Sequence, residues 1–257
     1  MNPTDERYHR QVVLSEFGLE AQAKLIRSRV LIAGIGGLGS PAALYLAAAG
    51  VGSLDLLDDD WVLPSNLNRQ ILHWTRDTDR LKVESAREKL EQVNPGIAIC
   101  DIQKRLESYL SEPELPDYDL VLDCLDGLPG RFALNDYCVH REIPLVHGGA
   151  IRFTGQITSV DPGRGPCLRC FLPDSPEQCT TCDREGILGP VTGMIGTMQA
   201  MEAIKLLTGA GKPLIGRLLL VDGLAGQWTE VPIERDPDCP VCGRLGMEKH
   251  HASATKS

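Results

Sequence analysis

The stretch Arg29-Val-Leu-Ile-Ala33, followed directly by Gly34-Ile-Gly36-Gly37-Leu-Gly39, decides the fold class of this chain. The apolar run has the character of a buried strand, and residues 40–49 have helical composition with a proline near their start. Glycines in such a turn let the backbone come close to a ligand, and the free N–H groups at the helix start favour an anion. The stretch therefore predicts a strand, a phosphate-binding turn and a helix.

A second expected strand, residues 53–57, ends in Asp58, Asp59 and Asp60. These acids lie about 20 residues beyond the glycine turn, where nucleotide-binding folds place a carboxylate for the ribose. The two features together predict a nucleotide site and leave the kind of nucleotide open.

Polar and basic residues further along favour ATP. The segment Ser65-Asn66-Leu-Asn68-Arg69-Gln70 is followed by Lys82. A triphosphate with pyrophosphate as its leaving group needs fixed cationic donors, whereas a dinucleotide needs few. Arg69 and Lys82 could equally be solvated surface charges.

Apolar runs alternate with helical patterns over the first 150 residues. Strands are expected at 29–33, 53–57, 96–100, 119–123 and 144–147, and helices at 40–49, 81–93, 106–110 and 131–140. This alternation predicts an α/β fold with a Rossmann-like, mostly parallel sheet and helices on both faces. Asp58, Asp60 and Asp126 then fall at the carboxyl ends of strands, where catalytic groups gather.

The pattern changes after residue 150. We expect an antiparallel strand at 155–160, an irregular loop at 162–189, a helix at 196–208 and strands at 217–221 and 227–231. The chain is thus interpreted as one domain over 1–246. Its nucleotide-binding half covers about 1–150, a crossover loop covers about 171–190, and 247–257 form a disordered tail.

Charge and composition exclude several classes. A net charge of −9 argues against nucleic acid or an anionic membrane as partner, because such binding needs a basic face. No run approaches the roughly 20 apolar residues of a membrane span, and no signal peptide is recognisable at the N-terminus. We therefore expect a cytoplasmic protein, whose nine cysteines serve metal binding, catalysis or packing before disulfides.

Two C-x-x-C knuckles, Cys167 with Cys170 and Cys239 with Cys242, predict a structural zinc site. Four thiolates in this pattern match closed tetrahedral coordination. A third pair, Cys179 and Cys182, also permits other zinc pairings or a redox disulfide.

Several further residues have both a chemical and an ordinary interpretation. Cys182 precedes an expected helix and is either a nucleophile or an idle surface thiol. Asp126 follows a strand and either positions Mg²⁺ or forms a turn. Core packing is expected of Cys100, Cys124 and Cys138, and His73 and His147 are expected to be packed or surface histidines rather than ligands.

Over nearly its whole length the chain resembles the bacterial ThiF/MoeB/HesA family of ubiquitin-activating-enzyme-like adenylyltransferases. The resemblance is carried by Arg7-Tyr-His-Arg10-Gln, Gly34 to Gly39, Asp58 to Asp60, Ser65 to Gln70, Lys82, Asn94-Pro95, Asp123-Cys-Leu-Asp126, Gly155-Gln156, Cys182, Gly186 to Pro190, Gln199 to Lys205 and the two knuckles.

The resemblance implies the following roles. The nucleotide would be bound by Gly34, Gly36, Gly37, Gly39, Asp58, Asp60, Ser65, Asn66, Asn68, Arg69, Lys82 and Asp126. Asp126, Arg69 and Lys82 would also be catalytic, with Asp126 positioning Mg²⁺, and the four knuckle cysteines would bind Zn²⁺. Arg10 would reach into the site of a neighbouring subunit, so a homodimer is expected.

The resemblance also implies the reaction and the partners. Mg-ATP would adenylate the C-terminal Gly-Gly carboxylate of a ubiquitin-like sulfur carrier and release pyrophosphate, and the acyl-adenylate would then accept sulfur. Cys182 matches a crossover-loop cysteine that forms an acyl-linked intermediate in some members. No rhodanese-like segment follows Cys242, so the sulfur donor is expected to be another protein, such as a cysteine desulfurase or a rhodanese.

Two details depart from or divide the family pattern. Members usually carry Thr before and Asn after the essential aspartate, whereas Leu125 and Gly127 flank Asp126, so one side-chain contact to the nucleotide is expected to be missing.

Residues 167–173, 222–223 and 227–228 look like the thiamine (ThiF) branch, which acts on a ThiS-type carrier. Residues 201–204 and 212–213 look at least as much like the molybdenum-cofactor (MoeB) branch, which acts on a MoaD-type carrier. The balance favours ThiF.

Two other classes compete with this interpretation. An NAD-dependent oxidoreductase would use the same glycine turn and Asp58, but no hydride-transfer site is evident and Arg69 and Lys82 would have no purpose. A zinc-stapled interaction protein without activity would leave the glycine turn unexplained.

Overall fold

The computed structural model describes residues 1–172 and 185–243. The expected tail at 247–257 and most of the expected crossover loop at 171–190 lie outside these residues.

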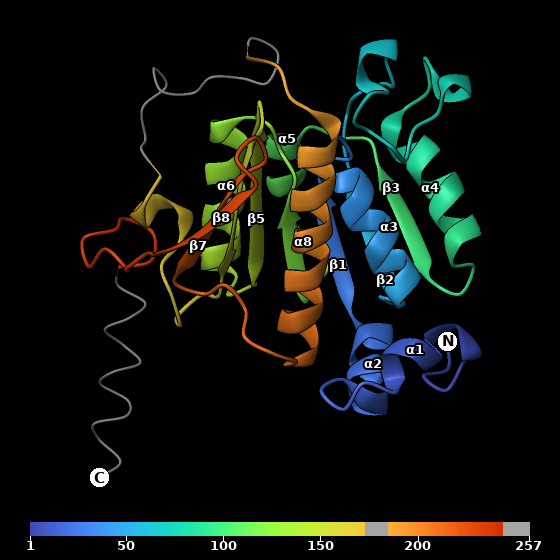
Figure 1. Ribbon diagram of the computed structural model, residues 1–257, viewed down its shortest axis with the longest axis horizontal. Coiled ribbons are helices and arrows are strands. Elements are labelled where there is room, and N and C mark those ends of the chain that lie inside the picture. The colour runs from blue at the N-terminus through green and yellow to red at the C-terminus, as the bar shows by residue number, and fades with distance from the viewer. Residues whose placement is uncertain (173–184, 244–257) are drawn as a thin grey trace.

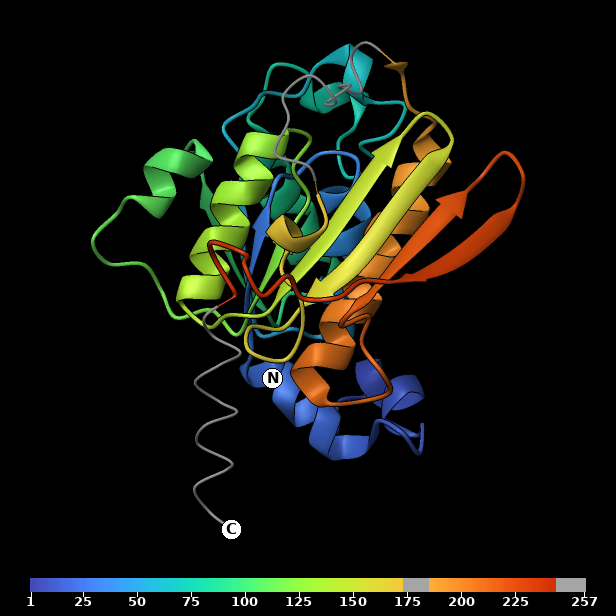
Figure 2. The ribbon, with the colours of Figure 1, turned by 90° about the vertical axis from the view of Figure 1, so that its left-hand side faces the viewer.

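One eight-stranded sheet runs through the molecule in the order β3-β2-β1-β4-β5-β6-β7-β8 (Figures 1 and 2). The parallel strands are β1 (Arg29–Ala33), β2 (Ser53–Leu57), β3 (Ala98–Ile102), β4 (Leu120–Asp123) and β5 (Leu145–Ile151). The antiparallel strands are β6 (Thr154–Val160), β7 (Arg217–Asp222) and β8 (Gln227–Pro232). The sheet confirms the predicted architecture, and its strand order reverses between β1 and β4, where such folds bind ligands.

Helices cover both faces of the sheet (Figure 2). They are α1 (His9–Val12), α2 (Gly18–Arg27), α3 (Gly39–Ala49), α4 (Lys82–Val93), α5 (Leu106–Leu110), α6 (Leu128–His140) and α8 (Gly189–Thr208). Strand β1 shows how the two cores form, because its side chains alternate between the faces. Val30 and Ile32 join the core beneath α3, α4 and α8, while Leu31 and Ala33 join the core beneath α5 and α6.

Two glycines of the turn after β1 are required by its geometry. Gly34 has a φ of +92°, and a Cβ there would lie 2.7 Å from the carbonyl oxygen of Cys124 in the neighbouring chain segment. A Cβ at Gly39 would lie 2.0 Å from the carbonyl oxygen of Gly34. Any side chain at these positions would therefore push α3 and the turn away from the sheet.

The structure differs from the sequence-based prediction at several elements, among them β3, α8, α1 and α2. Strand β3 begins two residues later than expected, because the side chain of Asn94 accepts a hydrogen bond from the Gly96 amide in a turn. Helix α8 begins at Gly189 rather than at residue 196, with Pro190 in its first turn, where a missing N–H costs nothing. Helices α1 and α2 were not predicted.

The prediction that Cys100 belongs to the core is wrong. Cys124 and Cys138 are buried as expected, but Cys100 is exposed. It lies on β3, which is the edge strand of the sheet and has no neighbour on its outer side. Within the described part of the chain, no helix combines the length and the apolar character needed to cross a membrane.

Candidate active site

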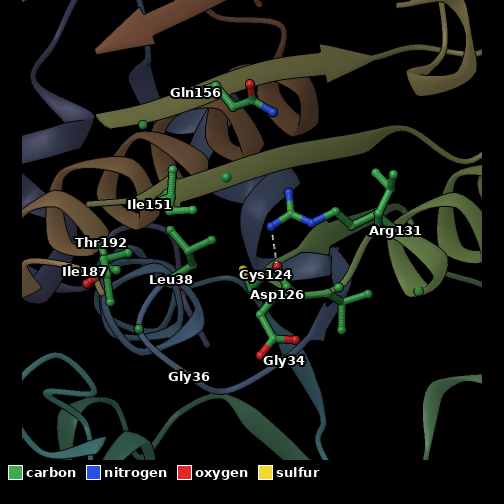
Figure 3. Close-up of a pocket in the computed structure, with 18 of the residues that line it drawn as sticks. Gly34, Gly36, Leu38, Cys124, Asp126, Arg131, Ile151, Gln156, Ile187 and Thr192 are labelled. Atoms are coloured by element: carbon green, nitrogen blue, oxygen red, sulfur yellow. Dashed lines mark hydrogen bonds between the residues drawn. The ribbon is translucent and has the colours of Figure 1, made fainter. Parts of the chain in front are cut away.

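A cavity of about 1050 Å³ opens at the carboxyl ends of β1, β2 and β4. Figure 3 shows the glycine turn on one side of it and α6 and the β5–β6 hairpin on the other. Among the residues predicted to form the site, its lining includes Gly34, Gly36, Gly37, Asp58, Asp60, Arg69, Lys82 and Asp126. The topology thus brings together residues that are almost 100 positions apart in the sequence.

Asp58 holds the glycine turn against the end of β2. Its carboxylate accepts one hydrogen bond from the amide of Ile35 at 2.7 Å and one from the amide of Asp60 at 2.9 Å. Burial raises the pKa of Asp58, although the charge of Lys82 and these two amides favour the ionised form. Asp58 therefore shapes the turn, and its remaining lone pairs face the cavity that it lines.

His73 holds the other end of the same peptide segment. Its Nε2 lies 2.9 Å from the carbonyl oxygen of Ile35, and its Nδ1 lies 2.9 Å from Oγ of Ser85. Burial lowers the pKa of His73 to about 4, so the ring is neutral at physiological pH. A carbonyl can only accept, so Nε2 carries the proton and donates it to Ile35.

The two predicted cations are held differently. Nζ of Lys82 is buried and lies 2.7 Å from the exposed carboxylate of Asp60. The guanidinium of Arg69 donates to the carbonyl oxygen of Ser65 at 2.9 Å and to the side chain of Asn68 at 3.1 Å. Both cations line the cavity, where they would meet phosphate groups.

Four predicted nucleotide ligands are not among the residues that line the cavity: Gly39, Ser65, Asn66 and Asn68. Asn66 accepts a hydrogen bond from the amide of Leu63, and Asn68 and Ser65 hold Arg69. In this structure these residues shape the turn that carries the arginine.

Asp126 follows β4 and projects its carboxylate into the cavity toward the glycine turn (Figure 3). The preceding residue, Leu125, donates its amide hydrogen to Asp123 at 3.1 Å. Its carbonyl oxygen accepts a hydrogen bond from Arg131 of α6. The backbone of Leu125, directly before Asp126, is therefore held at both its N–H and its C=O group.

A buried polar group under the cavity was missed by the sequence analysis. Nδ1 of His147 lies 2.7 Å from Oδ2 of Asp123, and its Nε2 lies 3.1 Å from the side-chain nitrogen of Gln156. Arg131 also donates to the carbonyl oxygen of Gly148 at 2.8 Å. The sequence contains one feature of this group, the two glycines that directly follow His147, but it does not indicate the partners of the histidine.

The protonation of this group follows from its surroundings. Burial would raise the pKa of Asp123, but the charge of Arg131 and the hydrogen bond from His147 outweigh it, so the pKa is lowered. Burial lowers the pKa of His147, against the opposing effect of Asp123. The pair is thus a carboxylate and a neutral imidazole, with the Nδ1 proton donated to Asp123.

The cavity has the features that a nucleotide site needs. The side-chain oxygen of Gln70 is buried in its wall and has no hydrogen-bond partner among the described residues. A Cβ at Gly37 would lie 3.0 Å from the side chain of Thr192, so only glycine leaves the turn open on that side. An unpaired acceptor, an open glycine turn and two cations fit ATP.

The four knuckle cysteines converge as predicted. Cys167 and Cys170 lie in a short 3-10 helix and its N-cap, and their sulfurs lie within 4.8 Å of those of Cys239 and Cys242. The Sγ atoms of Cys167 and Cys239 are 3.7 Å apart. Tetrahedral zinc with bonds of about 2.3 Å places its sulfurs about 3.8 Å apart, so the set fits the metal.

One of the four sulfurs is already suited to metal binding. A hydrogen bond from the Cys242 thiol, assisted by the Asn135 side chain, outweighs burial and lowers the pKa of Cys167 to about 5. The thiolate is the form that coordinates a metal. The residues thus match zinc in number, distance and chemistry.

Two predicted residues lie elsewhere. Arg10 is exposed on α1, beside the start of β1 and thus at the opposite end of that strand from the glycine turn (Figure 1). It does not line the cavity of its own chain. Cys182, like Cys179, lies outside the described residues.

Curated relatives match the chain almost from end to end. The sulfur carrier protein ThiS adenylyltransferase of Escherichia coli (strain K12) is 46% identical over 245 residues, which is 95% of this chain and 97% of the relative. The molybdopterin-synthase adenylyltransferase of the same strain is also 46% identical, over 93% of this chain and 96% of the relative. The relatives are adenylyltransferases, so the oxidoreductase hypothesis gains no support.

Solved structures support the fold. The crystal structure of E. coli MccB with ATP superposes with a TM-score of 0.83 at 23% identity, covering 93% of this chain and 74% of that one. At this identity the likeness shows the fold alone.

The family model agrees with both the geometry and the relatives. The ThiF family matches residues 8–241, which contain the glycine turn, Asp126 and three of the four knuckle cysteines, with Cys242 directly after the matched range. The chain is therefore an adenylyltransferase that belongs to the ThiF family.

Proposed function

We propose that this enzyme uses Mg-ATP to adenylate the C-terminal Gly-Gly carboxylate of a small ubiquitin-like sulfur carrier. The observation that carries the proposal is the position of Asp126, which shares one cavity with the glycine turn, Arg69 and Lys82. A carboxylate and two cations around a phosphate-binding turn suit nucleotidyl transfer better than hydride transfer.

The reaction assigns a role to each side chain. A carboxylate oxygen of the carrier attacks the α-phosphorus of ATP, the bond from that phosphorus to the bridging oxygen breaks, and pyrophosphate leaves with the bonding electrons. Lys82 and Arg69 neutralise the charge that develops on the leaving group. Asp126 would hold Mg²⁺, which supplies further neutralisation between the phosphates.

The cavity has room for a second substrate beside the nucleotide. Beyond the glycine turn its lining continues over the β5–β6 hairpin and strand β7, with Gly149, Gly155 and Leu220. An extended glycine tail could pass close to the backbone of these strands, because the tail carries no side chains of its own. The attacking carboxylate would then lie between β5 and Asp126.

A ThiS-type carrier is our first choice, and a MoaD-type carrier is the alternative. Relatives named for ThiS and for molybdopterin synthase are equally similar to this chain, so identity does not separate them. The preference rests on the motifs at residues 167–173, 222–223 and 227–228.

Pyrophosphate exchange into ATP with each purified carrier tests the choice. We expect kcat/KM to be at least about tenfold higher with the ThiS-type carrier, a difference of about 1.4 kcal/mol. The matched control for each carrier is the same protein without its last two glycines. A preference for the MoaD-type carrier would assign the enzyme to the other branch.

The remaining parts complete the proposal. The zinc site joins the knuckle after β6 to the C-terminal knuckle and is structural, because its four ligands leave no open position. Sulfur would come from a separate donor, a cysteine desulfurase or a rhodanese protein, with Cys182 acting in transfer but not in adenylation. A homodimer in the cytoplasm remains our expectation from the sequence.

A further inference from the structure

We propose that His147 is a positioning residue for adenylation, which fixes the direction of Asp126 through Asp123 and the backbone of Leu125. This inference rests on the proposed function of the cavity. His147 itself does not line the cavity, so it acts through its neighbours and not on the substrates.

The first step is the bond from His147 to Asp123. Both side chains are fully buried, and Nδ1 of His147 donates to Oδ2 of Asp123 at 2.7 Å. The other carboxylate oxygen, Oδ1, accepts the amide hydrogen of Leu125 at 3.1 Å. A buried carboxylate keeps its place only when its lone pairs are satisfied, so the imidazole holds the carboxylate whose other oxygen holds Leu125.

The second step is the hydrogen bond that holds the carbonyl group of the same residue, Leu125. Arg131 donates to the carbonyl oxygen of Leu125 and, at 2.8 Å, to that of Gly148, which follows His147 on β5. Its Nη1 lies 3.3 Å from Nδ1 of His147. Figure 3 shows the guanidinium above Asp126, with the bond to Leu125 dashed. Asp126 thus follows a residue whose backbone N–H and C=O groups are both fixed.

The third step is the packing that sets the ring of His147. Gln156 of β6 donates to its Nε2 at 3.1 Å. A Cβ at Gly148 would lie 2.5 Å from Gln199, and one at Gly149 would lie 3.1 Å from Gln156. The two glycines therefore admit the side chains that enclose this group.

Loss of the Nδ1 donor would move Asp126. Without it, Asp123 would be a buried carboxylate one donor short, and the nearest cation is Arg131. Turning Arg131 toward Asp123 would release the carbonyl of Leu125. The carboxylate of Asp126 would then be free to shift, and displacement by about 1 Å at a reacting centre can cost about a hundredfold in rate.

A pair of variants separates the two ring nitrogens. In His147→Asn the amide nitrogen replaces Nδ1 and can still donate to Asp123, whereas in His147→Gln it replaces Nε2 and leaves Asp123 without this donor. We expect His147→Gln to lower kcat for pyrophosphate exchange by about 10- to 100-fold, with KM for ATP within about twofold. The Mg²⁺ concentration for half-maximal activity should rise, and His147→Asn should restore most of the activity.

Thr158→Val is the matched control. Thr158 is buried and lies directly opposite His147 on β6, with hydrogen bonds to the carbonyls of Leu214 and Arg217. Its loss should lower thermal stability without changing kcat or the Mg²⁺ requirement. Equal kinetic losses in Thr158→Val and His147→Gln would make the effect one of general destabilisation and overturn the inference.

A measurement on the wild-type enzyme makes the test independent of how well the variants fold. In the wild-type enzyme, ¹⁵N NMR of labelled histidines should show His147 as the neutral Nδ1–H tautomer, and an Nε2–H tautomer or an imidazolium would overturn the proposal. Absence of exchange in the wild type with either carrier would instead refute the proposed function.

Discussion

At the scale of single residues, the site is built by fixing peptide groups. The backbone N–H and C=O groups of Leu125 are bound by Asp123 and Arg131. Those of Ile35 are bound by Asp58 and His73. Both segments carry groups that must meet the nucleotide, namely Asp126 and the glycine turn. Preorganised groups of this kind stabilise a transition state without further rearrangement.

Asp126→Ala should abolish adenylation while the protein stays folded. Removing one preorganised charged group typically costs a factor of at least about a hundred in kcat. The measurement is pyrophosphate exchange, with circular dichroism to confirm folding. Asp117→Ala is a suitable control, because Asp117 is a fully exposed acid before β4 that forms a surface ion pair with Arg141 at 3.4 Å. Near-normal exchange in a folded Asp126→Ala enzyme would remove Asp126 from the mechanism.

Because His73 is buried as a neutral ring, the free energy of unfolding should fall when the pH is lowered from neutral to mildly acidic values. The pKa of His73 is about 4 in the folded protein and 6.5 in the reference state, so the unfolded chain binds the proton first as the pH falls. Stability is therefore complete above about pH 6.5 and falls by up to about 3 kcal/mol as the pH approaches 4. Urea unfolding at several pH values would measure this.

The control for His73 separates it from the carboxylates. His73→Gln should be less stable at pH 7 but should lose less stability than the wild type between pH 6.5 and 4. Exposed His140→Gln should keep the wild-type pH dependence. Parallel curves for the wild type and His73→Gln would show that His73 does not titrate as described.

At the scale of elements, the sequence predicted what local patterns control. The alternation of apolar runs and helical segments located β1, β2, α3 and α4 to within about one residue, because periodicity follows directly from burial. The start of α8 was missed, because Gly and Pro usually mark the end of a helix or strand. Here Gly189 is required by close packing, since a Cβ at this position would lie 2.4 Å from the carbonyl oxygen of Asn68. Such a tertiary contact leaves no local signal.

The same distinction explains the site. Gly34, Asp58, Lys82 and Asp126 follow strands or start a helix and so could be placed at one edge of the sheet. The hydrogen bonds around His147 could not be predicted, because they join residues of β4, β5, β6 and α6 across the sheet. A histidine beside two glycines does not indicate which carboxylate it faces.

The zinc knuckles are an element that can be tested alone. We expect about one zinc per chain in the wild type, lost in Cys170→Ser and Cys242→Ser, which should also melt at lower temperature because structural zinc contributes to folding. Cys100→Ser is the control, since Cys100 is exposed on β3. Zinc content by metal analysis decides the pairing, and loss of zinc in Cys179→Ser or Cys182→Ser instead would contradict it.

At the scale of the whole molecule, Arg10 is separated from the cavity of its own chain, because it lies before the start of β1 and the cavity opens at the other end of that strand. If Arg10 enters a neighbouring subunit's site, two inactive variants should complement each other. Mixing Arg10→Ala with Asp126→Ala should form heterodimers with one complete site, and about a quarter of wild-type activity is expected after random exchange of subunits. Activity no higher than that of the separate variants would place Arg10 outside the site of a partner.

The central claim is that the enzyme forms an acyl-adenylate on a Gly-Gly carboxylate, and intact mass spectrometry of the carrier tests it most directly. A purified ThiS-type or MoaD-type carrier would be incubated with the enzyme and Mg-ATP and quenched in acid. We expect the carrier to gain the mass of one adenylyl group, with pyrophosphate released in equal amount, and a carrier without its last two glycines to stay unmodified. Unmodified full-length carriers of both types in the presence of folded enzyme would contradict the claim.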